Sequence, residues 1–200
     1  RLDEIYGTEG MGQTAENVAE KYNIGRQDQD AFAVRSQKQA TTAHEKGRFT
    51  AEIIPVEIPQ RKAASVLFNE DEFIKPHTTI EDLAKLKPAF KKDGTVTAGN
   101  SSGLNDGAAA MLIASEEGAN MYKLKPLAQI ITSAVVGVEP RIMGMGPVQA
   151  SNKALEKAGL TMDNIDIIEL NEAFSAQSLA CIRQWGLDDN DPRINPNGGA

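Results

Sequence analysis

The sequence predicts an α/β protein, and three observations lead to this fold class. Apolar strand-like runs alternate with helical segments from about residue 105 onward, the order expected of strands and helices packed in layers. The preceding residues are polar and helix-rich, with only short extended pieces. A loop over residues 99–107 joins the two parts, because its three glycines, two asparagines and two serines do not favour a regular element.

The first part is expected to consist mainly of two helices. Thr14 is a suitable N-cap for a helix over residues 14–22. A longer helix is expected over residues 27–46, because small residues mark one face and Gly47 is a suitable residue just past its end. Two short elements follow, an edge strand at residues 53–58 and a helix at residues 80–87.

The second part is expected to contain the sheet. Three strands are predicted from apolar runs, at residues 108–114, 127–138 and 165–170. Three helices are predicted between and after them, at residues 115–123, at residues 147–158 and from residue 175 to about residue 185. The middle helix has Pro147 at its start and Gly159 at its end, which are favourable positions for these residues.

Composition excludes several classes of function. The 200 residues are 40% hydrophobic, which is enough for a core, and the net charge of −7 disfavours nucleic acid or an anionic membrane as the partner. A single cysteine excludes a disulfide framework and a CxxC metal site. The only basic run, residues 83–92, has four lysines and no acid. It is either a site for an anionic ligand or a solvated face.

Three polar or glycine-rich segments are candidates for chemistry, since each adjoins a predicted strand or helix end. Residues 171–174 (NEAF) place Asn171 after a strand, where it could donate to an oxyanion or cap the next helix. The loop at residues 99–107 could approach a ligand closely or pack on a strand. Residues 144–147 could present N–H groups to an anion or form a helix N-terminus with proline.

Three other reactive residues are not expected to take part in chemistry. Cys181 lies in the middle of a helix between apolar residues, which is typical of a small buried side chain. His44 and His77 are in polar surroundings and close to no nucleophile in sequence, so they are interpreted as surface residues. The spacing of these residues provides no zinc site, and the sequence predicts none for any other metal.

Seven segments together resemble the thiolase family over the whole chain. Two of these segments are specific to that family. They are the motif NEAF directly after a predicted strand, and the run GTVTAGN-SGLNDGAA that precedes it in the sequence. The similar segments are TAENVAEKY (14–22), RQDQDAFAVRSQ (26–37), GRFTAEIIPV (47–56), GTVTAGNSSGLNDGAAA (94–110), MGMGP (143–147), IIELNEAFSAQ (167–177) and NPNGGA (195–200).

This resemblance implies a thiolase-like α-β-α-β-α layered fold with an inserted loop domain, of which the chain would be a part. Residues 1–104 would form the loop domain that covers coenzyme A. Residues 105–124 would end the N-terminal thiolase half, and residues 125–200 would begin the C-terminal half. The resemblance also implies a cytoplasmic homodimer or homotetramer that acts on acyl-CoA and CoA and binds no cofactor permanently, because coenzyme A is a substrate.

The resemblance also implies a reaction and a set of residues. A cysteine attacks a 3-oxoacyl-CoA, acetyl-CoA leaves, and a second CoA accepts the acyl chain. Asn171 would hold a water that stabilises the oxyanion, Ser102 would contact the pantetheine arm, and Lys75 would lie near the adenosine end. The pantetheine and acyl-chain tunnel would be lined by Leu2, Met11, Ala98, Met143 and Phe174.

Some family features are expected outside these 200 residues. The nucleophilic cysteine is expected upstream of Arg1, and the GHP histidine and second cysteine downstream of Ala200. Gly10 stands where many acetoacetyl-CoA thiolases have a histidine. Several segments resemble bacterial 3-oxoadipyl-CoA and 3-ketoacyl-CoA thiolases, which act in aromatic or fatty-acid degradation. The alternatives are an acetoacetyl-CoA thiolase that performs the Claisen condensation, and a non-catalytic relative that binds CoA or lipid.

Overall fold

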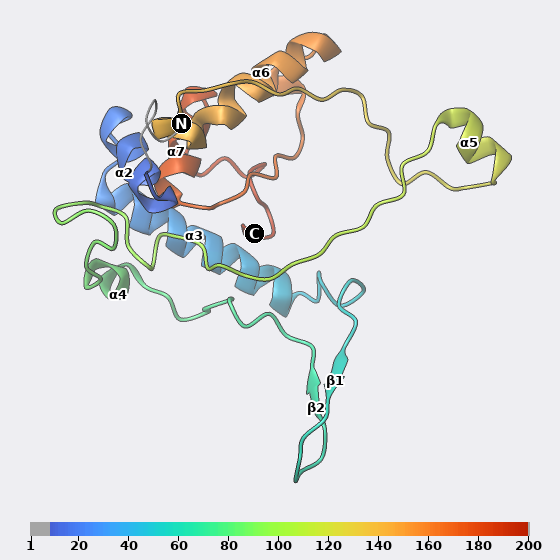
Figure 1. The fold of residues 1–200 in the computed structure, drawn as a ribbon, viewed down its shortest axis with the longest axis horizontal. Helices are drawn as coiled ribbons and strands as arrows, with labels where there is room; N and C mark the ends of the chain where they lie inside the picture. The colour runs from blue at the N-terminus through green and yellow to red at the C-terminus, as the bar shows by residue number, and fades with distance from the viewer. Residues whose placement is uncertain (1–8, 200) are drawn as a thin grey trace.

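The computed structural model describes residues 9–199 as a helical body from which two segments project (Figure 1). Helices α2, α3, α6 and α7 form the body. A β-hairpin extends from one side of it, and a long extended arm carries the short helix α5 away from it. The bounds are α2 Met11–Lys21, α3 Arg26–Glu45, β1 Val56–Ile58, β2 Val66–Phe68, α4 Ile80–Ala84, α5 Glu116–Met121, η1 Pro140–Met145, α6 Gly146–Ala158, η2 Met162–Asn164 and α7 Ser175–Gln184.

Helix α7 lies at the centre of the core. Its residues Ser175–Ile182 are all buried, and Leu179 and Ile182 are almost completely enclosed. Val18 of α2 and Phe32 of α3 are buried in the same cluster. Each large side chain of this kind contributes about 1.5–3 kcal/mol by leaving water. Packing of three helices therefore fixes the position at which α7 begins.

The helix starts and ends are mostly those predicted. Gly47 and Gly159 follow α3 and α6 in the left-handed conformation, with φ of 68° and 66°, so both predicted helix ends are confirmed. Ser115 caps α5 by accepting a hydrogen bond from the Gly118 N–H. The Thr14 prediction is wrong, because α2 begins after Gly10. The Thr14 hydroxyl instead donates to the Met11 carbonyl within the helix, at 2.7 Å.

The predicted strand at residues 53–58 is shorter than expected. Only Val56–Ile58 forms a strand, and it pairs antiparallel with Val66–Phe68, Glu57 lying opposite Leu67. All six strand residues are exposed. The hairpin therefore contributes no side chain to the buried core of the described residues.

The strands predicted at residues 108–114 and 127–138 are wrong as secondary structure. Both segments are extended, but neither is paired with another strand of residues 9–199, and most of their apolar side chains are exposed. A strand requires a neighbour for its backbone hydrogen bonds. The contacts of the second segment come from α6, whose Lys153 and Lys157 ammonium groups each donate to one of its carbonyls at 3.2 Å.

The strand predicted at residues 165–170 is reduced to a single parallel bridge. Ile168 donates its N–H to the Arg193 carbonyl and accepts from the Asn195 N–H, both at 2.9 Å. The bridge leads directly to residues 171–174 and α7. It thus anchors the segment that carries Asn171. No helix within residues 9–199 combines the length and apolar character needed to cross a membrane.

Candidate functional site

The segment Asn171–Phe174, called here the NEAF tip, lies between the Ile168 bridge and helix α7. The N-cap of α7 is Phe174, and no side chain caps the helix, so the interpretation of Asn171 as a helix cap is wrong. Asn171 is exposed, and its amide forms no hydrogen bond with the other described residues. Its donor and acceptor atoms are therefore available to a ligand.

The glycine-rich loop docks directly on the NEAF tip. Ser102 donates its N–H to the Ala173 carbonyl at 3.0 Å, and Ser175 at the start of α7 donates its N–H to the Asn100 carbonyl at 3.0 Å. Ser101 and Phe174 form an antiparallel bridge. The structure thus brings Ser102 and Asn171, which are 69 positions apart in the sequence, to neighbouring backbone segments.

Two buried carboxylates hold this loop and the residues that lead into it, and neither was predicted from the sequence. Glu16 of α2 accepts from the N–H groups of Thr95 and Val96 at 2.9–3.0 Å. Asp30 of α3 accepts from the Asn100 amide at 3.0 Å. Charged groups are rarely this buried unless paired. The signal in the sequence was a pair of acids on helix faces that otherwise carry small or apolar residues.

Phe90 contacts Phe174 and lies against Gly12, the residue after Met11. The rings of Phe90 and Phe174 meet edge to face, with centroids 6.1 Å apart. The Phe90 ring covers Gly12 so closely that a Cβ there would overlap it. Glycine is therefore required next to Met11, which is 53% exposed. Of the residues expected along the tunnel, Phe174 belongs to the NEAF tip, Met11 precedes the glycine covered by Phe90, and the exposed Ala98 precedes the loop that docks on the tip.

Met143 approaches the same region from η1. Its neighbour Gly144 packs on α7, where a Cβ would lie 2.7 Å from Cγ of Gln177. The Gly144 carbonyl accepts from the Cys181 thiol at 3.3 Å. Burial raises the pKa of Cys181 to about 11, so the thiol stays protonated. This confirms that Cys181 is a packing residue, while Met143 remains 45% exposed.

Lys75 is not brought to the NEAF tip. Its backbone N–H donates to Oε1 of Gln37 on α3, and its ammonium group donates to the Glu72 carbonyl, both at 2.7 Å. It therefore lies beyond the middle of α3, on an exposed segment. Leu2, the remaining expected tunnel residue, lies outside the described residues.

The basic run is partly neutralised by acids. The Lys85 ammonium lies 2.8 Å from Asp82, and the Lys91 ammonium lies 3.0 Å from Glu20. These carboxylates raise the pKa of both lysines through hydrogen bonds and charge. Half of the run is therefore paired, while the exposed Lys87 and Lys92 form no ion pair with the described residues.

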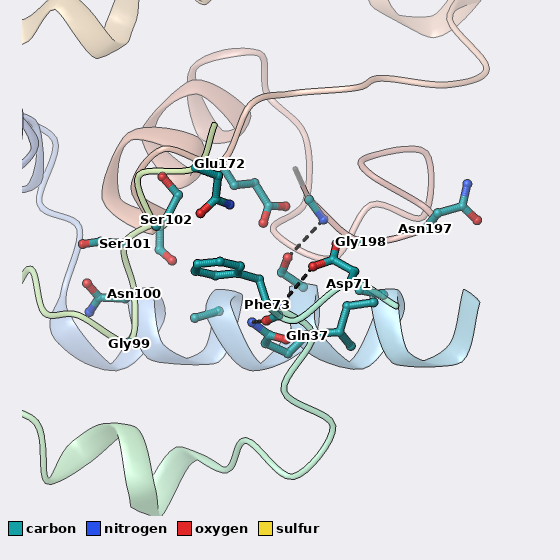
Figure 2. A pocket seen from close by; sticks show the side chains of 18 of the residues that line it. Gln37, Asp71, Phe73, Gly99, Asn100, Ser101, Ser102, Glu172, Asn197 and Gly198 are labelled. Atoms are coloured by element: carbon teal, nitrogen blue, oxygen red, sulfur yellow. Dashed lines mark hydrogen bonds between the residues drawn. The ribbon is translucent and has the colours of Figure 1, made fainter. Parts of the chain in front are cut away.

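A cleft of about 610 Å³ opens beside the NEAF tip (Figure 2). Ser102 and Glu172 line it on one side, and Phe73 and Gln37 on the other. The described lining residues include three acids and no Lys, Arg or His. An acidic lining repels phosphate, so this cleft does not suit the charged end of coenzyme A.

Comparison with known proteins places this geometry in a family. Residues 1–117 match the thiolase N-terminal domain, and residues 124–200 match the thiolase C-terminal domain. The chain belongs to the thiolase family. It is 56% identical over 200 residues to a beta-ketoadipyl-CoA thiolase of Acinetobacter baylyi, and 54% identical over 201 residues to an acetyl-CoA acetyltransferase of Chromobacterium violaceum. All of this thiolase chain, and half of each relative, is covered.

Solved structures agree with this assignment. The thiolase chain superposes on an acetyl-CoA acetyltransferase of Bacillus anthracis and on human mitochondrial 3-ketoacyl-CoA thiolase, each with a TM-score of 0.87, at 48% and 46% identity. The matches cover 94% and 95% of it and 47% of each solved chain. The fold class is thus the predicted thiolase-like α/β fold.

The chain spans about half the length of the relatives that it matches. A 3-oxoadipyl-CoA/3-oxo-5,6-dehydrosuberyl-CoA thiolase of Escherichia coli shows the same relation, with 50% identity over 98% of this chain and 49% of its own length.

Proposed function

We propose that the whole protein is an acyl-CoA C-acyltransferase that cleaves a 3-oxoacyl-CoA with coenzyme A. The observation that carries this proposal is the exposed amide of Asn171, which lies on a tip fixed to the buried start of α7 and next to the Ser102 loop. A neutral donor fixed in this way suits an oxyanion, because it needs no reorganisation as negative charge develops. Membership of the thiolase family supports the same chemistry.

The proposed reaction has two steps. A cysteine thiolate of the whole protein adds to the 3-oxo carbon, and the bond between carbons 2 and 3 then breaks. The electron pair stays on carbon 2, which takes up a proton, and acetyl-CoA leaves. The thiol of a second CoA then attacks the acyl-enzyme, releases the cysteine and forms the shortened acyl-CoA. Asn171 holds a water that stabilises the carbonyl oxygen on which negative charge develops. Cys181 is not the nucleophile, because it is buried and protonated.

We assign the remaining residues to binding. Ser102 contacts the pantetheine arm, and exposed apolar side chains around the NEAF tip line the tunnel. Lys75 interacts with the adenosine end, which is consistent with its distance from the tip. The tunnel residues are Leu2, Met11, Ala98, Met143 and Phe174.

We propose 3-oxoadipyl-CoA as the substrate. Thiolases named for this substrate in Acinetobacter baylyi and Escherichia coli support it, at 56% and 50% identity. The alternative is acetoacetyl-CoA, supported by the acetyl-CoA acetyltransferase of Chromobacterium violaceum at 54% identity. Each extra methylene buried in a tunnel offers about 0.8 kcal/mol, and hydrophobic pockets typically discriminate by one methylene on the order of 10–200-fold.

The role of Asn171 is tested in the whole protein by Asn171→Ala. We expect kcat for thiolysis to fall roughly 10²–10³-fold, the usual loss for one oxyanion donor. The Kd for CoA should stay at the parent value. Asn190→Ala, on an exposed turn after α7, is the matched control and should leave both values unchanged. Normal turnover with weakened CoA binding would show that Asn171 binds the ligand instead.

The substrate is tested by kcat/KM for acetoacetyl-CoA, 3-oxohexanoyl-CoA and 3-oxoadipyl-CoA. We expect 3-oxoadipyl-CoA to give the highest value. A higher value for acetoacetyl-CoA would overturn the substrate and leave the reaction in place. Absence of turnover with all three would overturn the reaction itself.

A further inference from the structure

The side chain of Asn195 holds the backbone immediately before Asn171. Its Oδ1 accepts from the Leu170 N–H at 2.7 Å, and its Nδ2 donates to the Leu170 carbonyl at 2.8 Å. The Asn195 side chain is fully buried, and its backbone is left-handed with φ of 44°. Asparagine tolerates this conformation better than most residues. The side-chain amide of Asn195 thus makes the two backbone hydrogen bonds to Leu170 that a neighbouring strand would otherwise make.

The same amide also holds the residue immediately after Asn171. Nδ2 of Asn195 donates to Oε1 of Glu172 at 2.7 Å. The Glu172 carboxyl lies against Gly199 so closely that a Cβ there would overlap it, and the Gly199 N–H donates to the Ser36 hydroxyl of α3 at 3.1 Å. Figure 2 shows Glu172 beside Ser102 at the edge of the cleft over α3. The Glu172 carboxyl is therefore held at the cleft edge between α3 and the segment of Asn195–Gly199.

Asn171 itself makes no side-chain hydrogen bond with the described residues, so its direction is set by its two neighbours. Both neighbours are fixed by Asn195. We propose that Asn195 and Glu172 are positioning residues, which hold the backbone on both sides of Asn171 so that its amide points at the water that stabilises the reacting oxygen. This inference rests on the proposed function of Asn171 as an oxyanion donor.

The chemistry of Glu172 favours a positioning role over plain stabilisation. Burial raises the pKa of its carboxyl, against the opposing effect of Ser36, Asn195 and Arg35. A carboxyl at such a place opposes folding when it ionises, and an apolar side chain would avoid that cost. The Glu172 carboxyl instead provides an acceptor oxygen that fixes the direction of Nδ2 of Asn195. Misplacement of a reacting group by about 1 Å costs on the order of 10²-fold in rate, so small shifts of the tip matter.

The test is a double-mutant cycle in the whole protein. We expect Asn195→Ala to lower kcat about 10²-fold with KM unchanged, as for a displaced catalytic group. In the Asn171→Ala background, Asn195→Ala should lower kcat less than about 2-fold further, because the group it positions is already gone. Equal losses in both backgrounds would show that Asn195 acts independently of Asn171 and would overturn the proposal.

The Glu172 variants provide a second experiment, which remains informative if Asn195→Ala does not fold. Glu172→Gln keeps an oxygen that accepts from Asn195, so we expect kcat within about 3-fold of the parent, whereas Glu172→Ala should lower it at least about 10-fold. Equal kcat for Glu172→Ala and the parent would overturn the role of Glu172. Asn190→Ala is again the control.

Hydrogen exchange separates this inference from the proposed function, since it requires no turnover. Asn195→Ala should raise the exchange rate of the Leu170 amide at least about 10-fold, while buried α2 amides remain unchanged. Unchanged protection of Leu170 would overturn the positioning role. Protection of Leu170 could fall as expected while the parent turns over no 3-oxoacyl-CoA. In that case Asn195 still holds the NEAF tip, and the proposed function is wrong.

Discussion

The Glu16 carboxylate accepts a hydrogen bond of 2.9 Å from the Val96 N–H, 80 positions further along the chain. The same carboxylate accepts from the Thr95 N–H and is only 3% exposed. It therefore satisfies two backbone donors of the segment that leads into the loop docked on the NEAF tip. At this position the backbone N–H groups are bonded by a side chain of α2 and not by the backbone of a neighbouring strand.

Glu16→Ala should strongly destabilise the protein, because it leaves two backbone donors without an acceptor. Each buried unsatisfied donor costs about 1–3 kcal/mol. The free energy of unfolding from urea denaturation measures the loss. Glu20→Ala, one turn later on α2, is the matched control, since its exposed pair with Lys91 should matter little. Equal stability of the two variants would contradict the role of Glu16.

Cys181 should be unreactive in the folded protein. With its pKa raised to about 11, only about 10⁻³ of the thiol is ionised at pH 8, and the side chain is fully buried. We expect no labelling by iodoacetamide at pH 8 on the time scale of minutes, and complete labelling in denaturant. Rapid labelling of the native protein would show that the thiol is accessible.

Glu172 should make stability depend on pH in a defined direction. Burial raises its pKa above the ordinary value of 4.5, so the folded state favours the protonated form. Its favourable contribution is present below pH 4.5 and is lost as pH rises through the raised pKa. Relative to Glu172→Gln, the parent should lose unfolding free energy over this window. The measurement is urea denaturation of both proteins at several pH values, and parallel curves would contradict the assignment.

Coenzyme A affinity of the whole protein should depend on Lys87 and Lys92, the lysines of the basic run that form no ion pair with the described residues. We expect Lys87→Ala combined with Lys92→Ala to weaken CoA binding, and the effect to shrink as salt is added. Lys85→Ala should weaken it less, because Asp82 already pairs with that charge. Calorimetric titration of CoA at low and high salt measures these changes. Identical affinities at low salt would show that the run is only a solvated face.

The helices could be predicted because their signals are local. Gly47, Gly159 and Ser115 fixed helix ends through their own backbone or side chain, and all three were placed correctly. Thr14 was misplaced because its hydroxyl has an alternative acceptor in the preceding turn. Helix limits therefore depend on a few neighbouring residues.

The sheet could not be predicted in the same way, because pairing depends on distant segments. Residues 108–114 have the composition of a strand but no partner among residues 9–199. The supports of the candidate site were missed for a related reason. Glu16 and Asn195 form hydrogen bonds with residues 79 and 25 positions away in the sequence. No local sequence pattern predicts a contact over such a separation. The motif itself located Asn171, while its surroundings required the structure.

Within residues 9–199 the extended arm pairs with no strand, which has a consequence for how this polypeptide behaves at high concentration. Leu104 and Leu127 are completely exposed, and residues 111–113 keep more than two thirds of their apolar surface in contact with water. Free backbone donors beside such side chains form a template for strand addition from another molecule. A solution of the 200-residue polypeptide should therefore be prone to aggregate through residues 104–113, and a charged substitution such as Met111→Lys should increase its solubility.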